Sequence, residues 1–291
     1  MNMRKTIYKN IIHCFLLLLG ILFSMQSQSA TMDVLEKLQR AYPNEIKSVN
    51  DKYIVWNDGT KMLVGNKSSA QSNEEKLDSP SLIDQLSDAS YPVGKPPNFS
   101  SFSPTGDPGR IRYTPFFLKM YGQSQESVKE KLTIIYWMPK VFGQKFPLEV
   151  TTVNSVDKKL SHVSDELQQL VVVQPKFLKY LDHPAGTFKW RAISDTSRLS
   201  AHSFGIAMDI NAQFSNYWQW DLEHHHEIVS ENTQLTYQND VPWEIVNIFE
   251  KNGFIWGGKW YHYDTMHFEY RPELLAKCNA DNSHTCVFCD R

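Results

Sequence analysis

The sequence lacks an excess of basic residues. Lys and Arg number 30 against 32 Asp and Glu, and the formal net charge is −2. Proteins that bind nucleic acid through the phosphates show a basic patch or stripe, because that charge is what the phosphates attract. No such stripe is visible in this chain, so we expect no nucleic-acid partner.

The sequence also has no apolar run long enough to span a membrane. The longest stretch of this kind, Cys14–Phe23, has about ten residues, whereas a spanning helix needs roughly 20. It follows three basic residues, Arg4, Lys5 and Lys9, and precedes Ser27 and Ser29, small residues at the −3 and −1 positions of a cleavage site. This order is typical of a secretory signal peptide.

We therefore expect residues 1–29 to be removed and the mature chain to be exported to the periplasm or cell-wall space. Cleavage takes three positive and no acidic residues, so the formal charge moves from −2 to −5. No lipid-acceptor cysteine follows the apolar run, because Cys14 lies at its start. We expect no stable membrane insertion after cleavage, although an uncleaved anchor is the alternative reading.

Cysteine is scarce, and three of the four cysteines lie in the last fourteen residues: Cys278, Cys286 and Cys289. In an oxidising compartment such thiols tend to pair, which predicts a disulfide in the tail with one thiol left over. The alternative is a small zinc knot that includes His284, but the second short cysteine pair of structural zinc sites is missing. Which cysteines pair is open.

Composition divides the mature chain into four parts. Residues 30–66 predict a short helix followed by a hairpin around Asn57-Asp58-Gly59. Residues 67–112 are rich in Ser and Pro and predict a linker or surface loop. Residues 113–275 predict the main domain, and residues 276–291 form the cysteine-containing tail.

The main domain mixes strand and helix patterns without strict alternation. Apolar residues recur at helical spacing between Val156 and Leu170, and a second helix is expected from about Pro242 to Gly253. Strand composition occurs at 132–137, 148–153, 187–193, 206–211, 254–256 and 266–270. We predict an α+β fold, with a small, mostly antiparallel sheet flanked by helices and an N-terminal extension.

Two histidines and an aspartate have the composition of a catalytic zinc site. His202 precedes Asp209 by seven residues, and His267 follows in the run Asp264-Thr265-Met266-His267-Phe268-Glu269. Two imidazoles and one carboxylate are a usual ligand set for catalytic zinc, which leaves a fourth position open. Gly205 would let the chain turn from a loop into the strand that carries Asp209. Pattern alone also allows satisfied core histidines.

The order of motifs resembles a known family. S-x-H-x-x-G-x-A-x-D at Ser200–Asp209, W-G-G-x-W at Trp256–Trp260 and D-x-M-H-F-E at Asp264–Glu269 are similar to the D-alanyl-D-alanine carboxypeptidase family of zinc metallopeptidases. That family includes VanY-type carboxypeptidases and phage L-alanyl-D-glutamate endopeptidases. The resemblance covers roughly residues 150–275 and implies a hedgehog or D,D-peptidase-like fold.

The resemblance also implies roles for single residues. His202, Asp209 and His267 would bind Zn²⁺, Asp264 would be the catalytic base, and Arg191 would stabilise the oxyanion, with Arg198 as the alternative. Glu269, on the same side of its strand as His267, is expected to orient that ligand. The side chains expected to contact substrate are Ser200, Trp256, Trp260 and His262, although aromatic residues at strand ends are usually core and His262 could be a surface histidine. His224-His225-His226 is read as a solvated loop rather than a second metal site.

The sequence therefore predicts a zinc peptidase that hydrolyses an amide bond in peptidoglycan stem peptides. Carboxypeptidase and endopeptidase activities both stay open, and the W-G-G-x-W run favours the endopeptidase branch. One alternative is a non-catalytic, zinc-containing cell-wall binding module of the same fold; the intact base and ligand positions argue against it. Another is an exported hydrolase of ordinary peptides.

The N-terminal pattern gives a direct test of export. We expect N-terminal sequencing of the exported protein to begin near Ala30, because the small residues before it fit a cleavage site. Recovery of the intact chain from the cytosol would contradict this prediction.

Overall fold

The structure is a computed structural model that describes residues 30–66, 73–87, 91–94, 107–193, 196–224 and 234–275. The predicted signal peptide, the three tail cysteines and His225-His226 lie outside these ranges. The chain divides into two compact units, one up to Val64 and one from Gly65 onward, and each is described by itself. Within the described ranges, no helix has both the length and the apolar composition needed to cross a bilayer.

The first unit is a helix and a small sheet. The helix covers residues 30–41 and is followed by three antiparallel strands, β1 (Ile46–Val49), β2 (Tyr53–Trp56) and β3 (Lys61–Leu63). Gly59, at φ +83°, lies in the turn between β2 and β3. This unit therefore contains a helix and a hairpin of β2 and β3.

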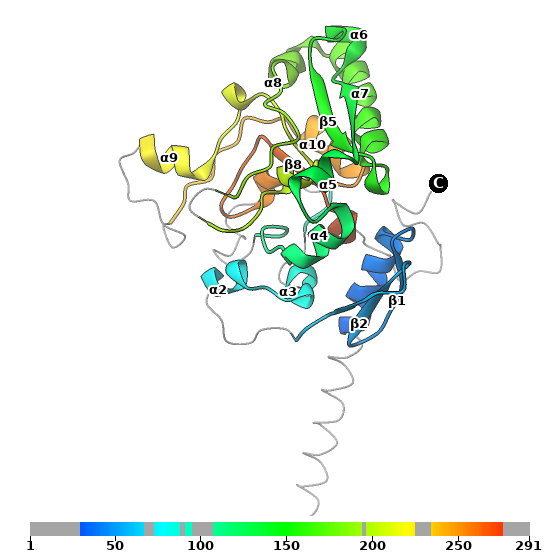
Figure 1. Ribbon diagram of the computed structural model, residues 1–291. Helices are drawn as coiled ribbons and strands as arrows, with labels where there is room; N and C mark the ends of the chain where they lie inside the picture. Colours follow the sequence, from blue (N-terminus) through cyan, green and yellow to red (C-terminus); the bar gives the residue numbers. More distant parts are fainter. Residues whose placement is uncertain are drawn as a thin grey trace, which may run out of the picture. The chain divides into compact units, whose positions relative to one another are not determined.

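The second unit combines short helices with two antiparallel sheets (Figure 1). Four helices precede its first strand: α2 (Asn73–Asp78), α3 (Leu82–Ser87), α4 (Thr114–Tyr121) and α5 (Gln125–Lys129). The later helices are α6 (Pro139–Phe142), α7 (Val156–Val173), α8 (Leu178–Leu181), α9 (Trp218–His224), α10 (Trp243–Lys251) and α11 (Pro272–Leu275). Short 3-10 turns are η2 (Val153–Ser155), η3 (Pro175–Phe177), η4 (Ala201–Phe204), η5 (Ala212–Phe214) and η6 (Gly257–Lys259). The predicted α+β class is confirmed.

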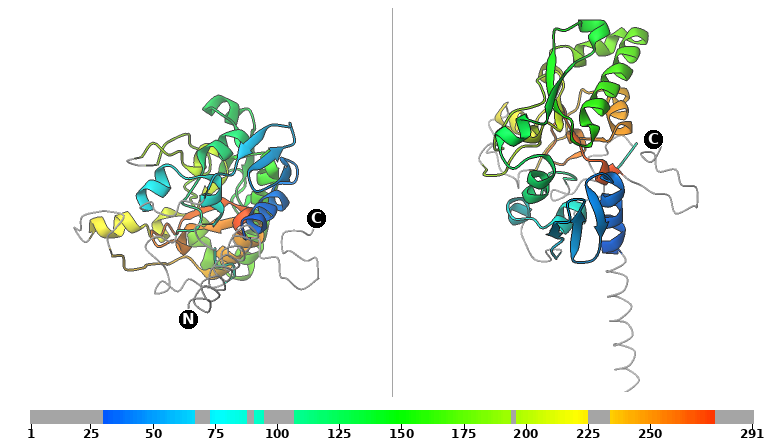
Figure 2. Two further views of the ribbon diagram at one scale, coloured as in Figure 1. Left: turned by 90° about the horizontal axis from the view of Figure 1, so that it is seen from below. Right: turned by 45° about the vertical axis from the view of Figure 1, so that its right-hand side comes forward.

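One sheet is the hairpin of β4 (Leu132–Tyr136) and β5 (Pro147–Thr151). The amphipathic helix α7 runs alongside it, as the views in Figures 1 and 2 both show. The helix buries Val156, Leu160, Val163 and Leu167 of the predicted stripe, whereas Leu170 is half-buried and Val171 is buried instead. The burial of this stripe fixes the hairpin and α7 as one packed layer.

The other sheet carries the chemistry. Its strand order is β6 (Ala207–Asp209), β8 (His267–Tyr270) and β7 (Phe254–Trp256), all antiparallel. Helix α10 packs against it, and the ring of Phe249 stacks on that of Phe268 with centroids 3.8 Å apart. The central strand β8 is buried along its whole length, so the side chains that it presents are held in fixed positions.

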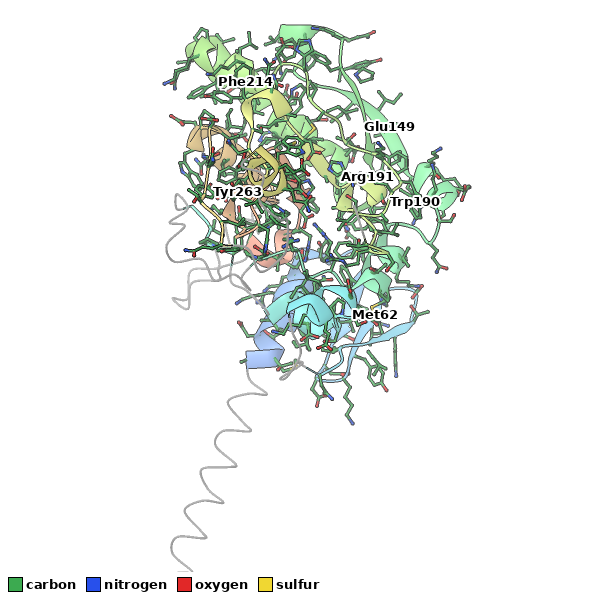
Figure 3. All side chains as sticks on the ribbon, turned by 90° about the vertical axis from the view of Figure 1, so that its left-hand side faces the viewer. Met62, Glu149, Trp190, Arg191, Phe214 and Tyr263 are labelled. Carbon is green, nitrogen blue, oxygen red and sulfur yellow. The ribbon has the colours of Figure 1, made fainter. Side chains whose placement is uncertain are left out.

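The strand predicted over residues 187–193 does not form. This segment is extended but makes only isolated bridges at its ends, Gly186 with Asp209 and Ala192 with Leu199. Its other backbone groups bond to the loop that follows it: Lys189 N–H donates to the His202 carbonyl and Arg191 N–H to the Ser203 hydroxyl. Figure 3 shows Trp190 and Arg191 on this segment, near Glu149 of β5. The prediction was wrong because the segment has a turn of 3-10 helix as its partner rather than a strand.

Gly257 and Gly258 lie where the chain approaches neighbouring atoms closely. A Cβ on Gly257 would lie 2.5 Å from the carbonyl oxygen of Asp264, and one on Gly258 would lie 2.2 Å from the Trp256 ring. Any side chain at Gly257 would therefore displace the backbone that carries Asp264.

Gly205 makes the turn that the sequence predicts. It ends η4 in the left-handed region, at φ +65°, and the chain then enters β6. A Cβ at this position would lie 2.7 Å from Leu132 and 3.1 Å from the backbone nitrogen of Thr151. The turn therefore depends on glycine both for its conformation and for its space.

Replacing Gly205 by Ala should destabilise the second unit by about 2–5 kcal/mol, the conformational cost of a left-handed alanine plus overpacking. Gly94→Ala is the control, because Gly94 also has positive φ, at +68°, but no atom within 4 Å of an added Cβ. It should cost only about 1–2 kcal/mol. Urea unfolding of both variants measures the difference. Equal losses would show that the close approach at Gly205 carries no energy.

Candidate metal centre and cavity

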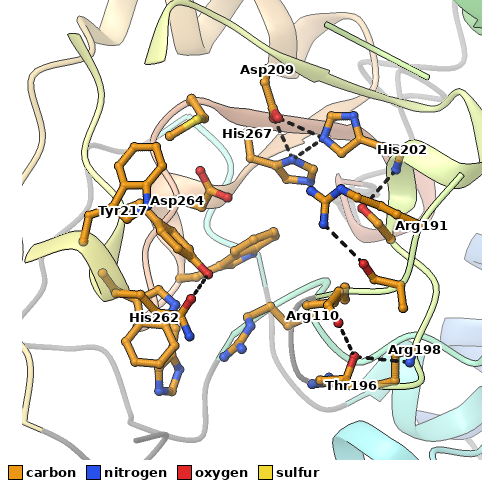
Figure 4. Close-up of a pocket in the computed structure, with 18 of the residues that line it drawn as sticks. Arg110, Arg191, Thr196, Arg198, His202, Asp209, Tyr217, His262, Asp264 and His267 are labelled. Carbon is orange, nitrogen blue, oxygen red and sulfur yellow. Dashed lines mark hydrogen bonds and ion pairs between the residues drawn. The ribbon is translucent and has the colours of Figure 1, made fainter. Parts of the chain in front are cut away.

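Three side chains converge from η4, β6 and β8. Asp209 and His267 face each other directly across the β6–β8 ladder, and His202 comes from η4 just before β6. His202 Nε2 lies 3.1 Å from Asp209 Oδ2 and 3.3 Å from His267 Nδ1, and His267 Nδ1 lies 3.0 Å from Asp209 Oδ1. These ligand atoms all lie within 4.8 Å of one another, so the three residues could hold a metal ion (Figure 4).

Both imidazoles are oriented through their second ring nitrogen. His202 Nδ1 lies 2.5 Å from the carbonyl oxygen of Thr187, and His267 Nε2 lies 3.2 Å from Glu269 Oε2. Each acceptor holds a proton on the outer nitrogen and turns the inner nitrogen toward Asp209. This pattern is typical of histidines that ligate metals, because the outer bond fixes the tautomer and the ring plane. The donor set therefore fits a metal ion.

In the metal-free protein, the imidazoles and the Asp209 carboxylate shift each other's pKa values. Burial alone would lower the pKa of His267, but its hydrogen bonds with Asp209 and Glu269 raise that pKa to about 10. Burial alone would raise the pKa of Asp209, yet His202 and His267 hold it far below its usual range. The centre is thus built around an ionised carboxylate that attracts cations.

Glu269 has a fully buried carboxylate that bonds to three side chains. Besides His267, it accepts from Arg112 Nη2 at 2.7 Å and from Arg271 Nη1 at 3.0 Å. Burial opposes its ionisation, but Arg112, the His267 hydrogen bond and Arg271 together keep its pKa far below the usual value. The predicted contact of Glu269 with His267 is present. The two arginines supply the positive charge that keeps the Glu269 carboxylate ionised.

Asp264 lies beside the triad, and its backbone carbonyl accepts a hydrogen bond from the His267 N–H at 3.2 Å. Its Oδ1 is buried and has no hydrogen-bond partner among the described residues. Burial and nearby Asp209 raise its pKa while His267 and His202 lower it, and the pKa settles at about 6. A half-buried carboxylate with an unsatisfied oxygen and a raised pKa, next to a candidate metal centre, can accept a proton near neutral pH.

The triad and Asp264 lie in a cavity of about 750 Å³. Arg191 and Arg198 also line it, and Figure 4 shows the Arg191 guanidinium turned toward the triad. Arg198 Nε instead lies 3.3 Å from Asp78 Oδ1 in α2. The geometry therefore brings Arg191, rather than Arg198, close to the predicted base and ligands.

The four residues predicted to contact substrate divide into two groups. Ser200, Trp260 and His262 line the cavity, whereas Trp256 does not. Trp256 is fully buried, donates from its ring nitrogen to the Thr265 carbonyl and packs against Phe268, so it belongs to the core. His262 is buried as well, at 1% exposure, which excludes the surface alternative for this residue.

Residues 107–112, within the Ser- and Pro-rich stretch, supply part of the cavity wall. Arg110 and Arg112 line the cavity. The backbone N–H and the ring Nδ1 of His262 both bond to the Asp107 carboxylate, at 3.1 and 2.6 Å. The Trp260 ring nitrogen donates to the Pro108 carbonyl at 2.6 Å. Composition did not reveal this segment, and the one available signal was the cluster of charged residues that follows the uncharged run 96–106.

The comparison with known families agrees with this centre. Residues 194–270 match the family model described as D-alanyl-D-alanine carboxypeptidase. The resemblance predicted from the motifs is confirmed over this segment. The matched range contains the triad and Asp264, but it begins three residues after Arg191 and does not include residues 107–112. No curated protein and no solved structure matches the chain.

The raised pKa of Asp264 predicts a stability effect in the metal-free protein. The pKa of Asp264 is about 6 in the folded protein, compared with a reference value of 3.8. Ionisation of this carboxyl group therefore lowers the free energy of unfolding when the pH is above both pKa values, and it has no effect when the pH is below both. Asp264→Asn should therefore raise the melting temperature at pH 8, on the order of 2–8 °C. The gain should vanish as the pH falls from about 6 to below 4.

The matched control is Asp240→Asn, which removes one exposed carboxylate of the same unit. Thermal unfolding after treatment with a chelator, at pH values from 4 to 8, makes the comparison. A pH-independent gain for Asp264→Asn, or an equal gain for the control, would contradict the role of burial.

Proposed function

We propose that this protein is a zinc peptidase that hydrolyses an amide bond in peptidoglycan stem peptides. The observation that carries the proposal is the convergence of His202, Asp209 and His267 beside Asp264, inside a cavity and within the segment that matches the carboxypeptidase family. Family membership alone would leave the reaction open, since related folds can lose catalysis. The candidate ligand set and the position of Asp264 beside it together support catalysis.

His202, Asp209 and His267 would hold the ion. Two nitrogen donors and one oxygen donor suit zinc, which binds such sets and leaves a position open in catalytic sites. When bound, zinc would supply a Lewis acid that polarises a carbonyl and acidifies a water molecule. Thr187 and Glu269 would keep the two imidazoles in the ligating tautomer.

The protein's own groups would handle protons and charge. Asp264, whose Oδ1 is unsatisfied among the described residues, would take the proton of the attacking water and pass it to the leaving amine. Arg191 would donate to the oxyanion that forms on the scissile carbonyl. The placement of Arg191 on the triad's side of the cavity supports this assignment.

The proposal includes export. A peptidase of the cell wall meets its substrate outside the cytoplasm, and the basic, apolar and small-residue order of residues 1–29 is the pattern that sends a chain there. We also propose that the cysteine tail stabilises the exported protein and takes no part in catalysis, since Cys278 and those after it follow the last motif.

Three variants separate the proposed roles when metal content and rate are measured on the same samples. Asp264→Ala should retain zinc and lose about 10²–10⁴-fold in turnover, the usual worth of a positioned base. Arg191→Ala should also retain zinc and lose about 10²–10³-fold in kcat. His267→Ala should lose both the metal and the activity.

The measurements are zinc content by elemental analysis and product formation from muropeptides by mass spectrometry, with and without chelator. Loss of zinc in Asp264→Ala would make that carboxylate a ligand and overturn its role as base. Full activity of Arg191→Ala with loss in Arg198→Ala would move the oxyanion role to Arg198. A wild type that binds zinc but cuts no peptide would favour the binding module.

A further inference from the structure

The two oxygens of the Glu269 carboxylate are held by different arginines. Oε2 lies 3.2 Å from His267 Nε2 and accepts from Arg112 Nη2 at 2.7 Å. Oε1 accepts from Arg271 Nη1 at 3.0 Å. The oxygen that contacts the imidazole is therefore the one that Arg112 holds, whereas Arg271 holds the oxygen that is turned away from the ring.

The two arginines differ in how they are anchored. Arg271 is fully buried, donates from Nε to Glu273 at 2.6 Å and lies over the Phe117 ring at 5.2 Å, so it keeps its place without Glu269. Arg112 bonds to Glu269, and its buried Nε has no hydrogen-bond partner among the described residues. Burying a guanidinium with an unsatisfied N–H costs free energy, so stability alone does not account for Arg112.

The turn that carries Arg112 approaches β7 and β8 through the backbone of Gly109. The Gly109 carbonyl accepts from Arg271 Nη1 at 3.1 Å, and the residue has φ +101°. A Cβ at this position would lie 2.4 Å from Ile255 Cδ1 and 3.3 Å from Glu269 Oε1. The turn therefore needs glycine at this point to come close enough for Arg112 to reach the carboxylate.

The chain on each side of Gly109 is fastened as well. Before it, the Pro108 carbonyl accepts from the Trp260 ring nitrogen at 2.6 Å. After it, the Tyr113 N–H donates to the Gln85 side chain at 2.7 Å. Because the backbone is held both before and after Arg112, little conformational entropy remains to be lost when its side chain is fixed against Glu269.

We propose that Arg112 is a positioning residue of the metal centre, which holds Glu269 Oε2 against His267 Nε2 and thereby turns Nδ1 of that ring toward Asp209. This inference rests on the metal site of the proposed function. It adds that the affinity for the ion depends on a residue far ahead of the segment that matches the family. Partners of the outer nitrogen fix the plane and tautomer of a ligating histidine, which is how Arg112 acts without touching the ion.

Zinc affinity, measured by competition with a chromophoric chelator, tests the proposal without any substrate. Arg112→Gln should bind zinc about 10–100 times more weakly than the wild type, the usual effect of losing support behind a ligating histidine. Arg112→Lys should lie between the two, because it keeps the charge and loses the planar fork. Wild-type zinc affinity in folded Arg112→Gln would overturn the proposal.

The matched control is Arg110→Gln, which removes a positive charge from the same turn. The two arginine side chains are similarly buried, at 14% and 12% exposure, but Arg110 bonds to Asp107 rather than to Glu269. This control should leave zinc affinity nearly unchanged. An equal loss in Arg110→Gln would show that the charge or packing of the whole turn matters, and it would overturn the specific role of Arg112.

A double-mutant cycle tests whether Arg112 acts through Glu269. Glu269→Gln alone should weaken zinc binding, and adding Arg112→Gln should weaken it little further, because the shared interaction is already lost. Additive losses would mean that Arg112 acts by another route and would overturn the proposal. If Arg112→Gln does not fold in the presence of chelator, the cycle is run with Arg112→Lys, and the same two outcomes decide.

The visible spectrum of the cobalt(II)-loaded protein supplies a readout that a merely structural role would not change. Arg112→Gln should shift the absorption bands of the bound cobalt, since the orientation of the His267 ring changes, whereas Arg110→Gln should not. A lower melting temperature in chelator together with unchanged bands and zinc affinity would make Arg112 a purely structural residue and refute the proposal.

Hydrolysis of muropeptides by the zinc-loaded wild type is measured separately, so that the two proposals can fail independently. Zinc binding that depends on Arg112, without hydrolysis, would support the positioning role and refute the peptidase. Hydrolysis together with zinc binding that is indifferent to Arg112 would support the peptidase and refute the positioning role. A wild type that binds no zinc would refute both.

Discussion

The pairing of β6 with β8 is the interaction on which the candidate site depends. It sets Asp209 directly opposite His267 although 58 residues separate them in the chain, and it brings the turn with His202 to the same edge. A shift of the register by one residue would turn Asp209 to the other face and abolish the cluster. The stacking of Phe249 on Phe268 resists such a shift, because it locks the central strand against α10.

The second constraint is electrostatic. Buried carboxylates surround the centre, and each is ionised at a cost that its partners offset: Glu269 with Arg112 and Arg271, and Asp209 with two imidazoles. Asp264 is the exception, since its Oδ1 has no partner within the described part of the chain. The fold stabilises the carboxylates that hold the site together and leaves the proposed base unsatisfied, a division expected where reactivity competes with stability.

Much of this could be predicted from the sequence, and the reasons are physical. The stripe of α7, the turn at Gly205 and the narrow approach at Gly257 leave local signatures, because periodicity and glycine report backbone geometry directly. For residues 187–193 the predicted strand was wrong, since strand composition does not say whether a partner strand exists. Residues 107–112 left only a cluster of charged residues as a signal, because their order comes from long-range bonds to His262, Trp260 and Glu269, which no local pattern contains.

The position of residues 107–112 in the chain, which form part of the cavity wall, bears on how such a protein can diversify. The triad and Asp264 lie within the range that matches the family, whereas Arg110 and Arg112 come from a short segment far ahead of it. A substitution of Arg110, which bonds to Asp107 within the same segment, would change the charge of the cavity wall without removing a bond to β8. A substitution of Arg112 would do both, because its guanidinium also holds the Glu269 carboxylate that orients His267. One short stretch of the chain therefore couples the cavity wall to the metal centre.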